Sequence, residues 1–92
     1  YTDSGGNYPA VIFAHGFFLD HTMFDEQVEM LSKRFRCIAW DQRGFGKTPA
    51  PGPFSYWDSA RDAVALLDYL QIDQAVFVGM SQGGFVSLRA AL

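Results

Sequence analysis

Three short apolar runs stand out along the chain, and each is followed by a polar residue or a glycine. They are AVIFA (10–14), RCIAW (36–40), which is apolar after Arg36, and AVFV (75–78). Continuous apolar runs of this length, with β-branched and aromatic side chains, are typical of strands buried on both faces of a parallel sheet. We therefore predict three buried strands.

Two segments with helical periodicity separate these runs. The apolar stripe of the first consists of Phe24, Val28, Leu31 and Phe35. That of the second consists of Ala60, Ala63, Val64, Leu67 and Leu70. A capping box is predicted at the start of each helix: Thr22 with Asp25 in the first and Ser55 with Asp58 in the second. Strands alternating with amphipathic helices predict right-handed crossovers and a parallel sheet, so the expected fold class is α/β. Segments 2–9 and 47–55 are expected to be a strand connection and a long turn.

Composition narrows the classes of function. A hydrophobic content of 49% argues against disorder, and a net charge of −3 without a Lys/Arg cluster argues against nucleic-acid binding. No apolar run approaches the roughly 20 residues of a membrane span, and no signal peptide is visible, so we expect no membrane partner. Cys37 is the single cysteine, which excludes an intrachain disulfide and suits a reducing compartment. We expect a cytoplasmic protein, with Cys37 as a buried hydrophobe.

Unusual residues follow all three predicted strands. Ligands of open parallel sheets bind beyond the carboxyl ends of the strands. The segments at these ends are His15–Phe18 (HGFF), 41–48 (DQRGFGKT) and 79–84 (GMSQGG). The candidate chemistry is therefore expected at one edge of the sheet.

The third segment matches the G-x-S-x-G nucleophile elbow, with glycines at Gly79 and Gly83 around Ser81. A sharp strand-to-helix turn strains the residue at its apex and needs small residues two positions away. Gly83 and Gly84 fall in the first helical turn, where each costs roughly 0.5–1 kcal/mol relative to alanine. A serine that merely caps a helix has no need of them, so we favour Ser81 as a nucleophile over a simple cap.

A dinucleotide-binding turn is the other interpretation of this segment. That turn needs G-x-G-x-x-G, and here the register gives Gly79, Ser81 and Gly84. The middle glycine, which lets the backbone approach the pyrophosphate, is replaced by serine. We therefore expect no nucleotide cofactor.

The HGFF segment is a candidate oxyanion loop. Backbone N–H groups of Phe17 and Gln82 would hold the oxyanion, and Phe17 and Phe18 would form an apolar wall for an acyl or aryl group. Gly16 permits the turn. His15 is expected to organise the loop rather than to act as a base, and His21 is expected to be a solvated loop residue.

Segment 41–48 lacks the spacing of a phosphate-binding loop. Asp41 and Arg43 are instead expected to fix a sharp turn through hydrogen bonds from side chain to backbone. Gly44 and Gly46 would supply backbone conformations that other residues avoid. We expect no metal site in the chain.

Together the three segments, in this order and at these spacings, resemble the α/β-hydrolase superfamily over nearly the whole chain. The closer resemblance is to the bacterial branch of aryl esterases, cofactor-free haloperoxidases and enol-lactone hydrolases. It implies that the chain carries the third, fourth and fifth strands of an eight-stranded sheet and needs no cofactor. It also implies a nucleophile at Ser81, oxyanion donors at Phe17 and Gln82, and structural roles for His15, Gly16, Asp41, Arg43, Gly44 and Gly46.

Two departures from the family pattern qualify this resemblance. Many relatives carry methionine in place of Gln82, which leaves the backbone donor unchanged. The family order is serine, then acid, then histidine, whereas His15 and His21 both precede Ser81. We therefore expect residues 1–92 to be the N-terminal to central part of a single domain, truncated at both ends and inactive by itself.

The expected activity of the parent protein is that of a serine hydrolase. Its substrate would be a small carboxylic ester, lactone or related acyl compound, cleaved through an acyl-enzyme on Ser81. The alternative is a non-catalytic relative that keeps the fold for ligand binding, because fold alone does not determine function.

Overall fold

A single sheet lies at the centre of the structure, a computed structural model that describes residues 1–50 and 52–92. Strands β2 (Ala10–Ala14), β3 (Arg36–Trp40) and β4 (Ala75–Gly79) are parallel, with β2 between the other two. Strand β1 (Thr2–Asp3) pairs antiparallel with β3, which gives the order β1-β3-β2-β4. The three predicted strands and the α/β fold class are confirmed.

Strand β1 lies in a segment for which a connection was predicted. Two residues are too few to show the alternation of a strand, and tertiary contacts define this one. Asp3 is the register partner of Ile38 on the neighbouring strand β3. The Asp3 carboxylate accepts hydrogen bonds from the Arg36 guanidinium at 3.0 and 2.7 Å. The ladder then continues through the Ser4 N–H, which donates to the Cys37 carbonyl at 3.0 Å.

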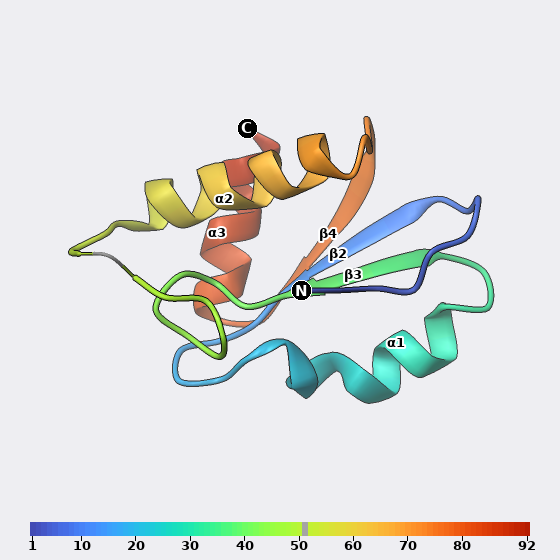
Figure 1. Ribbon diagram of the computed structural model, residues 1–92, viewed down its shortest axis with the longest axis horizontal. Helices are drawn as coiled ribbons and strands as arrows, with labels where there is room; N and C mark the ends of the chain where they lie inside the picture. The colour runs from blue at the N-terminus through green and yellow to red at the C-terminus, as the bar shows by residue number, and fades with distance from the viewer. Residues whose placement is uncertain (51) are drawn as a thin grey trace.

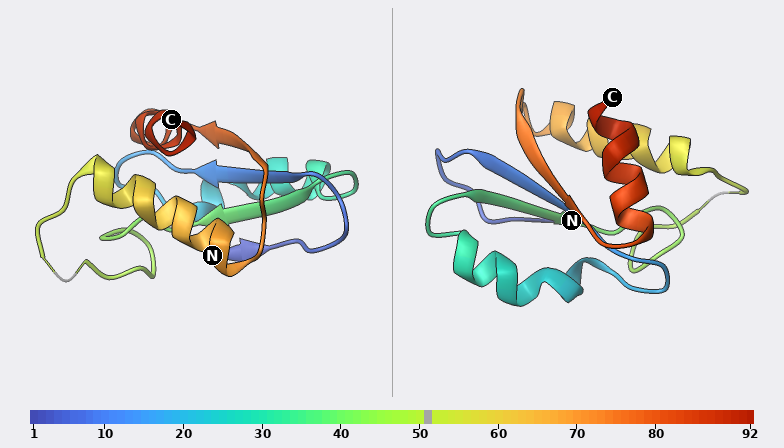
Figure 2. Two further views of the ribbon diagram at one scale, coloured as in Figure 1. Left: turned by 90° about the horizontal axis from the view of Figure 1, so that it is seen from above. Right: turned by 180° about the vertical axis from the view of Figure 1, so that it is seen from behind.

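Helices cover both faces of the sheet, and Figures 1 and 2 show the two layers. The 3₁₀ helix η1 (His21–Phe24) and helix α1 (Asp25–Leu31) lie on one face, and α2 (Tyr56–Tyr69) and α3 (Gln82–Ala91) lie on the other. The core under α2 and α3 contains Ile12, Ala14, Ile38, Trp40, Ala60, Ala63, Leu67 and Val86. The core under η1 and α1 contains Val11, Phe13, Phe24, Cys37 and Ala39. Cys37 is thus a buried hydrophobe as predicted, and burial raises the pKa of its thiol.

Strand β4 is not buried on both faces, so that part of the prediction is wrong. Val76 is 60% exposed and Val78 is 36% exposed. Their register partners on β2 are Val11 and Phe13, whose face is covered by η1 and α1. These two helices pack on β2 and β3, which leaves the same face of β4 open.

One predicted capping box is confirmed and the other is wrong. Ser55 and Asp58 cap α2 reciprocally: the Ser55 N–H donates to the Asp58 carboxylate at 3.0 Å, and the Asp58 N–H donates to the Ser55 hydroxyl. Thr22 and Asp25 do not form a capping box. The 3₁₀ helix η1 begins at His21, ahead of α1, and Asp20 caps it: the Thr22 N–H donates to the Asp20 carboxylate at 2.9 Å.

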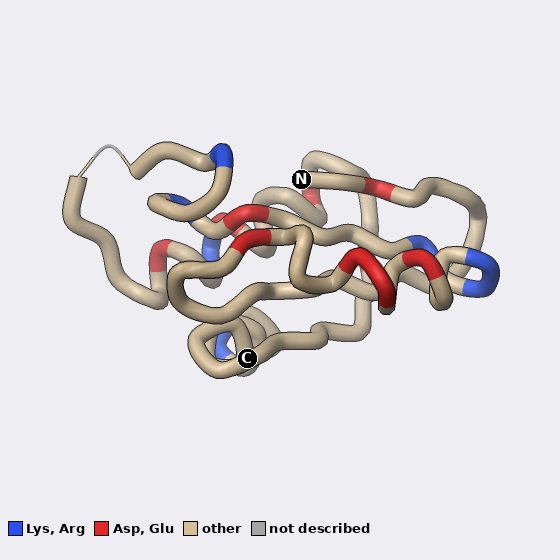
Figure 3. The backbone as a smooth tube through the Cα atoms, turned by 90° about the horizontal axis from the view of Figure 1, so that it is seen from below, with Lys and Arg blue, Asp and Glu red and all other residues tan. Residues whose placement is uncertain are grey.

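Charged residues of both signs are interspersed along the described backbone (Figure 3). None of the helices formed by the described residues is long and apolar enough to cross a membrane.

Candidate active site

Ser81 lies at the turn between β4 and α3, at the carboxyl edge of the sheet. Its backbone angles are φ 53° and ψ −114°, a conformation that L-residues rarely adopt. The side chain is exposed and accepts no hydrogen bond from the first N–H groups of α3, so it does not cap the helix. Strained residues of this kind cost about 1–3 kcal/mol and concentrate at functional sites.

Glycine is required on both sides of Ser81 because strand, helix and neighbouring strand meet there. A Cβ on Gly79 would lie 2.3 Å from the Gly83 carbonyl oxygen. A Cβ on Gly83 would lie 2.0 Å from the Ala14 carbonyl oxygen at the end of β2. The absence of side chains at these positions lets α3 start directly against two strand ends.

Two backbone N–H groups at the carboxyl edge of the sheet have no hydrogen-bond acceptor among the described residues: that of Gln82, which follows the serine, and that of Phe17. The loop that carries Phe17 is close to the elbow, since a Cβ on Gly16 would lie 2.8 Å from the Met80 Cε. The Met80 N–H also donates to the Ala14 carbonyl at 3.1 Å. Gln82 is the first residue of α3, where the helix dipole favours negative charge. This edge therefore offers unpaired donors to an anion.

His15 is buried and uses both ring nitrogens. Its Nδ1 is 2.8 Å from the Gly16 carbonyl oxygen, and its Nε2 is 3.0 Å from the Gln42 backbone nitrogen. Since the Gln42 N–H donates to Nε2, the proton resides on Nδ1, which donates to Gly16. The ring organises the loop, and neither nitrogen is available to serve as a base.

Gln42 was given no role by the motif and is fully buried. Its side-chain Nε2 donates to the His15 carbonyl at 2.6 Å, and its Oε1 accepts from the Gln82 Nε2 at 3.0 Å. The sequence offers one signal for this role: Gln42 is a polar residue close after a buried strand. A buried side-chain amide needs hydrogen-bond partners, so such a position indicates a structural contact.

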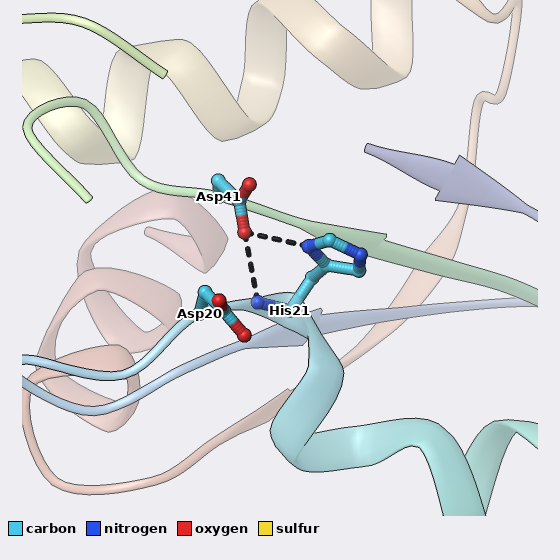
Figure 4. A group of neighbouring side chains, drawn as sticks. All are labelled: Asp20, His21 and Asp41. Carbon is cyan, nitrogen blue, oxygen red and sulfur yellow. Dashed lines mark hydrogen bonds and ion pairs between the residues drawn. The ribbon is translucent and has the colours of Figure 1, made fainter. Parts of the chain in front are cut away.

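Asp41 fixes the turn after β3 through three hydrogen bonds. Its carboxylate accepts from the His21 backbone N–H at 2.8 Å and from the His21 ring Nδ1 at 2.7 Å (Figure 4). It also accepts from the Lys47 backbone N–H at 2.9 Å. Burial raises the pKa of Asp41, but these hydrogen bonds outweigh burial and lower it to about 2. Gly46 has φ 53°, and a Cβ there would lie 2.4 Å from the Asp41 Cγ.

His21 and Arg43 make contacts that differ from the predicted ones. His21 is half-buried and bonded to Asp41 rather than solvated, because η1 brings it against the end of β3. Arg43 bonds a side chain rather than the backbone: its guanidinium contacts both oxygens of Asp62 at 2.6 Å and thereby ties the turn to α2. In the same turn, Gly44 has φ 84°.

Asp20, His21 and Asp41 are the described residues whose ligand atoms lie close enough to hold a metal, within 4.8 Å of one another. Figure 4 shows this group. Hydrogen bonds within the protein already explain why these three side chains are close together. The His21 Nδ1 donates to Asp41, and the Asp20 carboxylate caps η1 by accepting from the Thr22 N–H.

An aromatic cluster borders the loop after β2. The Phe17 ring lies 4.1 Å from that of Phe18 and 5.3 Å from that of Phe45, which contacts His15 edge-on at 5.5 Å. Phe18 is 83% exposed and has φ 62°. Next to it is a hollow of about 480 Å³ whose lining includes Phe18, Leu19 and Phe45. The sequence motifs did not predict Phe45 as a member of this cluster.

Asp41→Asn is expected to reduce the free energy of unfolding by about 2 kcal/mol at pH 7. The folded-state pKa of about 2 lies below the ordinary 3.8, so this stabilisation is complete above the ordinary value and is lost as pH falls through about 2. Urea unfolding of the whole protein at successively lower pH should show the difference shrinking. Asp73 is exposed and makes no hydrogen bond to the described residues, so Asp73→Asn is the matched control. A difference for Asp41→Asn that stays constant with pH would contradict the assignment.

Comparison with known proteins agrees with this architecture. Residues 9–92 match the family model described as alpha/beta hydrolase fold. The 3-oxoadipate enol-lactonase 2 of Acinetobacter baylyi is 38% identical over 85 residues, which is 91% of this chain and 32% of that protein. An epoxide hydrolase of Caballeronia sordidicola is 37% identical over 95 residues, which is 99% of this chain and 29% of that protein.

A solved structure gives the same result. A thermophilic esterase from Thermogutta terrifontis superposes with a TM-score of 0.89 at 37% identity, over 98% of this chain and 34% of that chain. The chain thus spans about a third of the length of the proteins it matches. By its elbow, its sheet order and these matches, the chain belongs to the alpha/beta hydrolase fold family.

Proposed function

We propose that the whole protein is a serine hydrolase of small carboxylic esters or lactones, with Ser81 as nucleophile. The observation that carries the proposal is the strained backbone of Ser81, whose hydroxyl is exposed. The unpaired N–H of Gln82 follows it directly, and the loop with the unpaired N–H of Phe17 approaches the elbow at Met80. No described residue uses that hydroxyl in a hydrogen bond, so it is available to attack a carbonyl carbon.

In the proposed reaction the Ser81 Oγ attacks the acyl carbon and gives up its proton to a histidine. The Phe17 and Gln82 N–H groups stabilise the oxyanion, a contribution of about 3 kcal/mol for a single donor. The histidine returns the proton to the leaving alkoxide, and water then hydrolyses the acyl-enzyme. His15 has no free nitrogen, and His21 is bonded to Asp41. We therefore assign the catalytic histidine and its acid to residues that follow Ser81, in the family order.

The side chains around the site favour a small apolar acyl or aryl group. Phe17 and Phe18 directly follow Gly16, which lies against Met80 of the elbow, and they are 56% and 83% exposed. Together with Phe45 they form an apolar aromatic surface. The names of the relatives agree with this substrate class, since one is an enol-lactonase and one an esterase.

Epoxide hydrolysis is the second candidate, because one relative is an epoxide hydrolase. The identity of the nucleophile argues against it. Attack of the Ser81 oxygen on an epoxide carbon would form an ether, and an ether offers water no carbonyl to attack. Acyl transfer instead forms an ester that water can cleave, which regenerates the serine.

Labelling of the whole protein tests this proposal. A fluorophosphonate should modify one serine stoichiometrically, and peptide mass spectrometry should locate the label at Ser81. A p-nitrophenyl ester should show a burst of one equivalent of nitrophenolate whenever deacylation is the slower step. A folded protein that stays unlabelled and hydrolyses no ester or lactone would support the non-catalytic, ligand-binding alternative instead.

A further inference from the structure

We infer that Gln42 is a positioning residue that sets the geometry between the two oxyanion donors; this inference rests on the proposed function. The three strand ends at the site are those of β3, β2 and β4, in this order across the sheet. Gln42 follows β3, and its side chain contacts His15, which follows β2, and Gln82, which follows the elbow after β4. One amide group therefore links all three.

The link is stiff because each partner is fixed. Gln42 is 0% exposed, His15 0% and Gln82 4%, so water does not compete for their hydrogen bonds. Gln42 holds His15 twice: its backbone N–H donates to the ring Nε2 at 3.0 Å, and its side-chain Nε2 donates to the backbone carbonyl at 2.6 Å. The planar amide then fixes where its Oε1 meets the Gln82 Nε2, at 3.0 Å.

Both proposed donors depend on this link. The Phe17 N–H is two residues beyond the held His15 carbonyl, and the other donor is the backbone N–H of Gln82 itself. Oxyanion donors act on charge that develops in the transition state, and not on the ground-state carbonyl. A loss of alignment between them should therefore lower kcat and leave KM nearly unchanged.

Methionine replacements test the inference in the whole protein, because methionine is close to glutamine in size and lacks the amide. Gln42→Met should lower kcat by about 10- to 100-fold, in the range of a misplacement of about 1 Å, with KM within about twofold. Inhibition by a boronic acid, whose tetrahedral serine adduct mimics the transition state, should weaken by a similar factor. Gln27 is exposed on α1, so Gln27→Met is the matched control for the substitution itself.

The double variant adds a second readout. Gln82→Met keeps the backbone N–H as a donor but removes the side-chain link that positions it. The bonds from Gln42 to His15 remain, so the loss of kcat should be smaller than for Gln42→Met. Gln42→Met/Gln82→Met should lose about as much as Gln42→Met alone, since both changes break the same link. If Gln42 only stabilised the fold, its replacement would lower the fraction of molecules with an active site and not kcat per site. We therefore express kcat per mole of Ser81 that the fluorophosphonate labels at completion.

The outcomes separate this inference from the proposed function. If wild-type Ser81 is neither labelled nor needed for turnover, the proposed function fails. If Ser81 is labelled and the ester is turned over, but Gln42→Met keeps kcat per titrated site within twofold of wild type, the positioning role is overturned. Should Gln42→Met fail to fold, Gln82→Met decides, and a kcat equal to that of wild type overturns the inference.

Discussion

Ser81→Ala is expected to lower kcat toward small esters by at least about 10⁴-fold in the whole protein, because the covalent route loses its nucleophile. Alanine at φ 53° is strained to the same degree as serine, and the hydroxyl bonds no described residue, so the fold should be unaffected. The measurement is kcat/KM for a p-nitrophenyl ester, together with loss of fluorophosphonate labelling. Activity within tenfold of wild type would rule out Ser81 as the nucleophile.

Two further variants, one at Ser59 and one at Ser81, serve as the control and as a measure of backbone strain. Ser59→Ala removes a buried hydroxyl of α2 that has no partner among the described residues, so it should leave the activity unchanged. Ser81→Gly should be as inactive as Ser81→Ala but more stable by about 1 kcal/mol, since glycine tolerates the positive φ. That difference would measure the strain held at the elbow, and equal stabilities would show that the turn stores none.

The central fold could be predicted because its signals are local. Run 10–14 is apolar throughout and run 36–40 is apolar after Arg36, and the apolar residues of both are buried in strands of the structure. Strand β1 has two residues and is defined by its pairing with β3, which no local pattern reveals. The exposure of Val76 and Val78 likewise depends on which elements cover β4, and the composition of the strand does not contain that information.

The site divides in the same way between local and distant contacts. The glycine spacing around Ser81 identified a turn whose strain and close backbone contacts the structure shows. The contacts of Gln42 and His21 were missed because their partners are distant: Gln42 bonds residues 27 and 40 positions away, and His21 bonds one 20 positions away. Polar residues at the end of a buried strand need such partners, but sequence spacing does not say which ones.

Gly83→Ala is expected to reduce the free energy of unfolding by about 3 kcal/mol or more, near the upper end of the effects of overpacking. The added Cβ would lie 2.0 Å from the Ala14 carbonyl oxygen and 2.6 Å from that of His15. Both neighbours are backbone atoms at the end of β2, so no side chain can rotate away. Relief requires α3 to move off the sheet, which would also displace the Gln82 N–H. Thermal or urea unfolding of the whole protein measures the loss of stability, and ester turnover should fall with it.

The adjacent glycine provides the matched control. A Cβ on Gly84 would have its nearest neighbour, the Gly79 carbonyl oxygen, at 3.8 Å, which is ordinary van der Waals contact. Gly84→Ala should therefore be tolerated, and it should stabilise α3 by roughly 0.5–1 kcal/mol because alanine favours helix. Opposite signs for the same substitution at neighbouring positions would show that close approach of β2, and not helix propensity, requires glycine at position 83. If both variants changed stability equally, the contact between α3 and the end of β2 would not be the reason for Gly83.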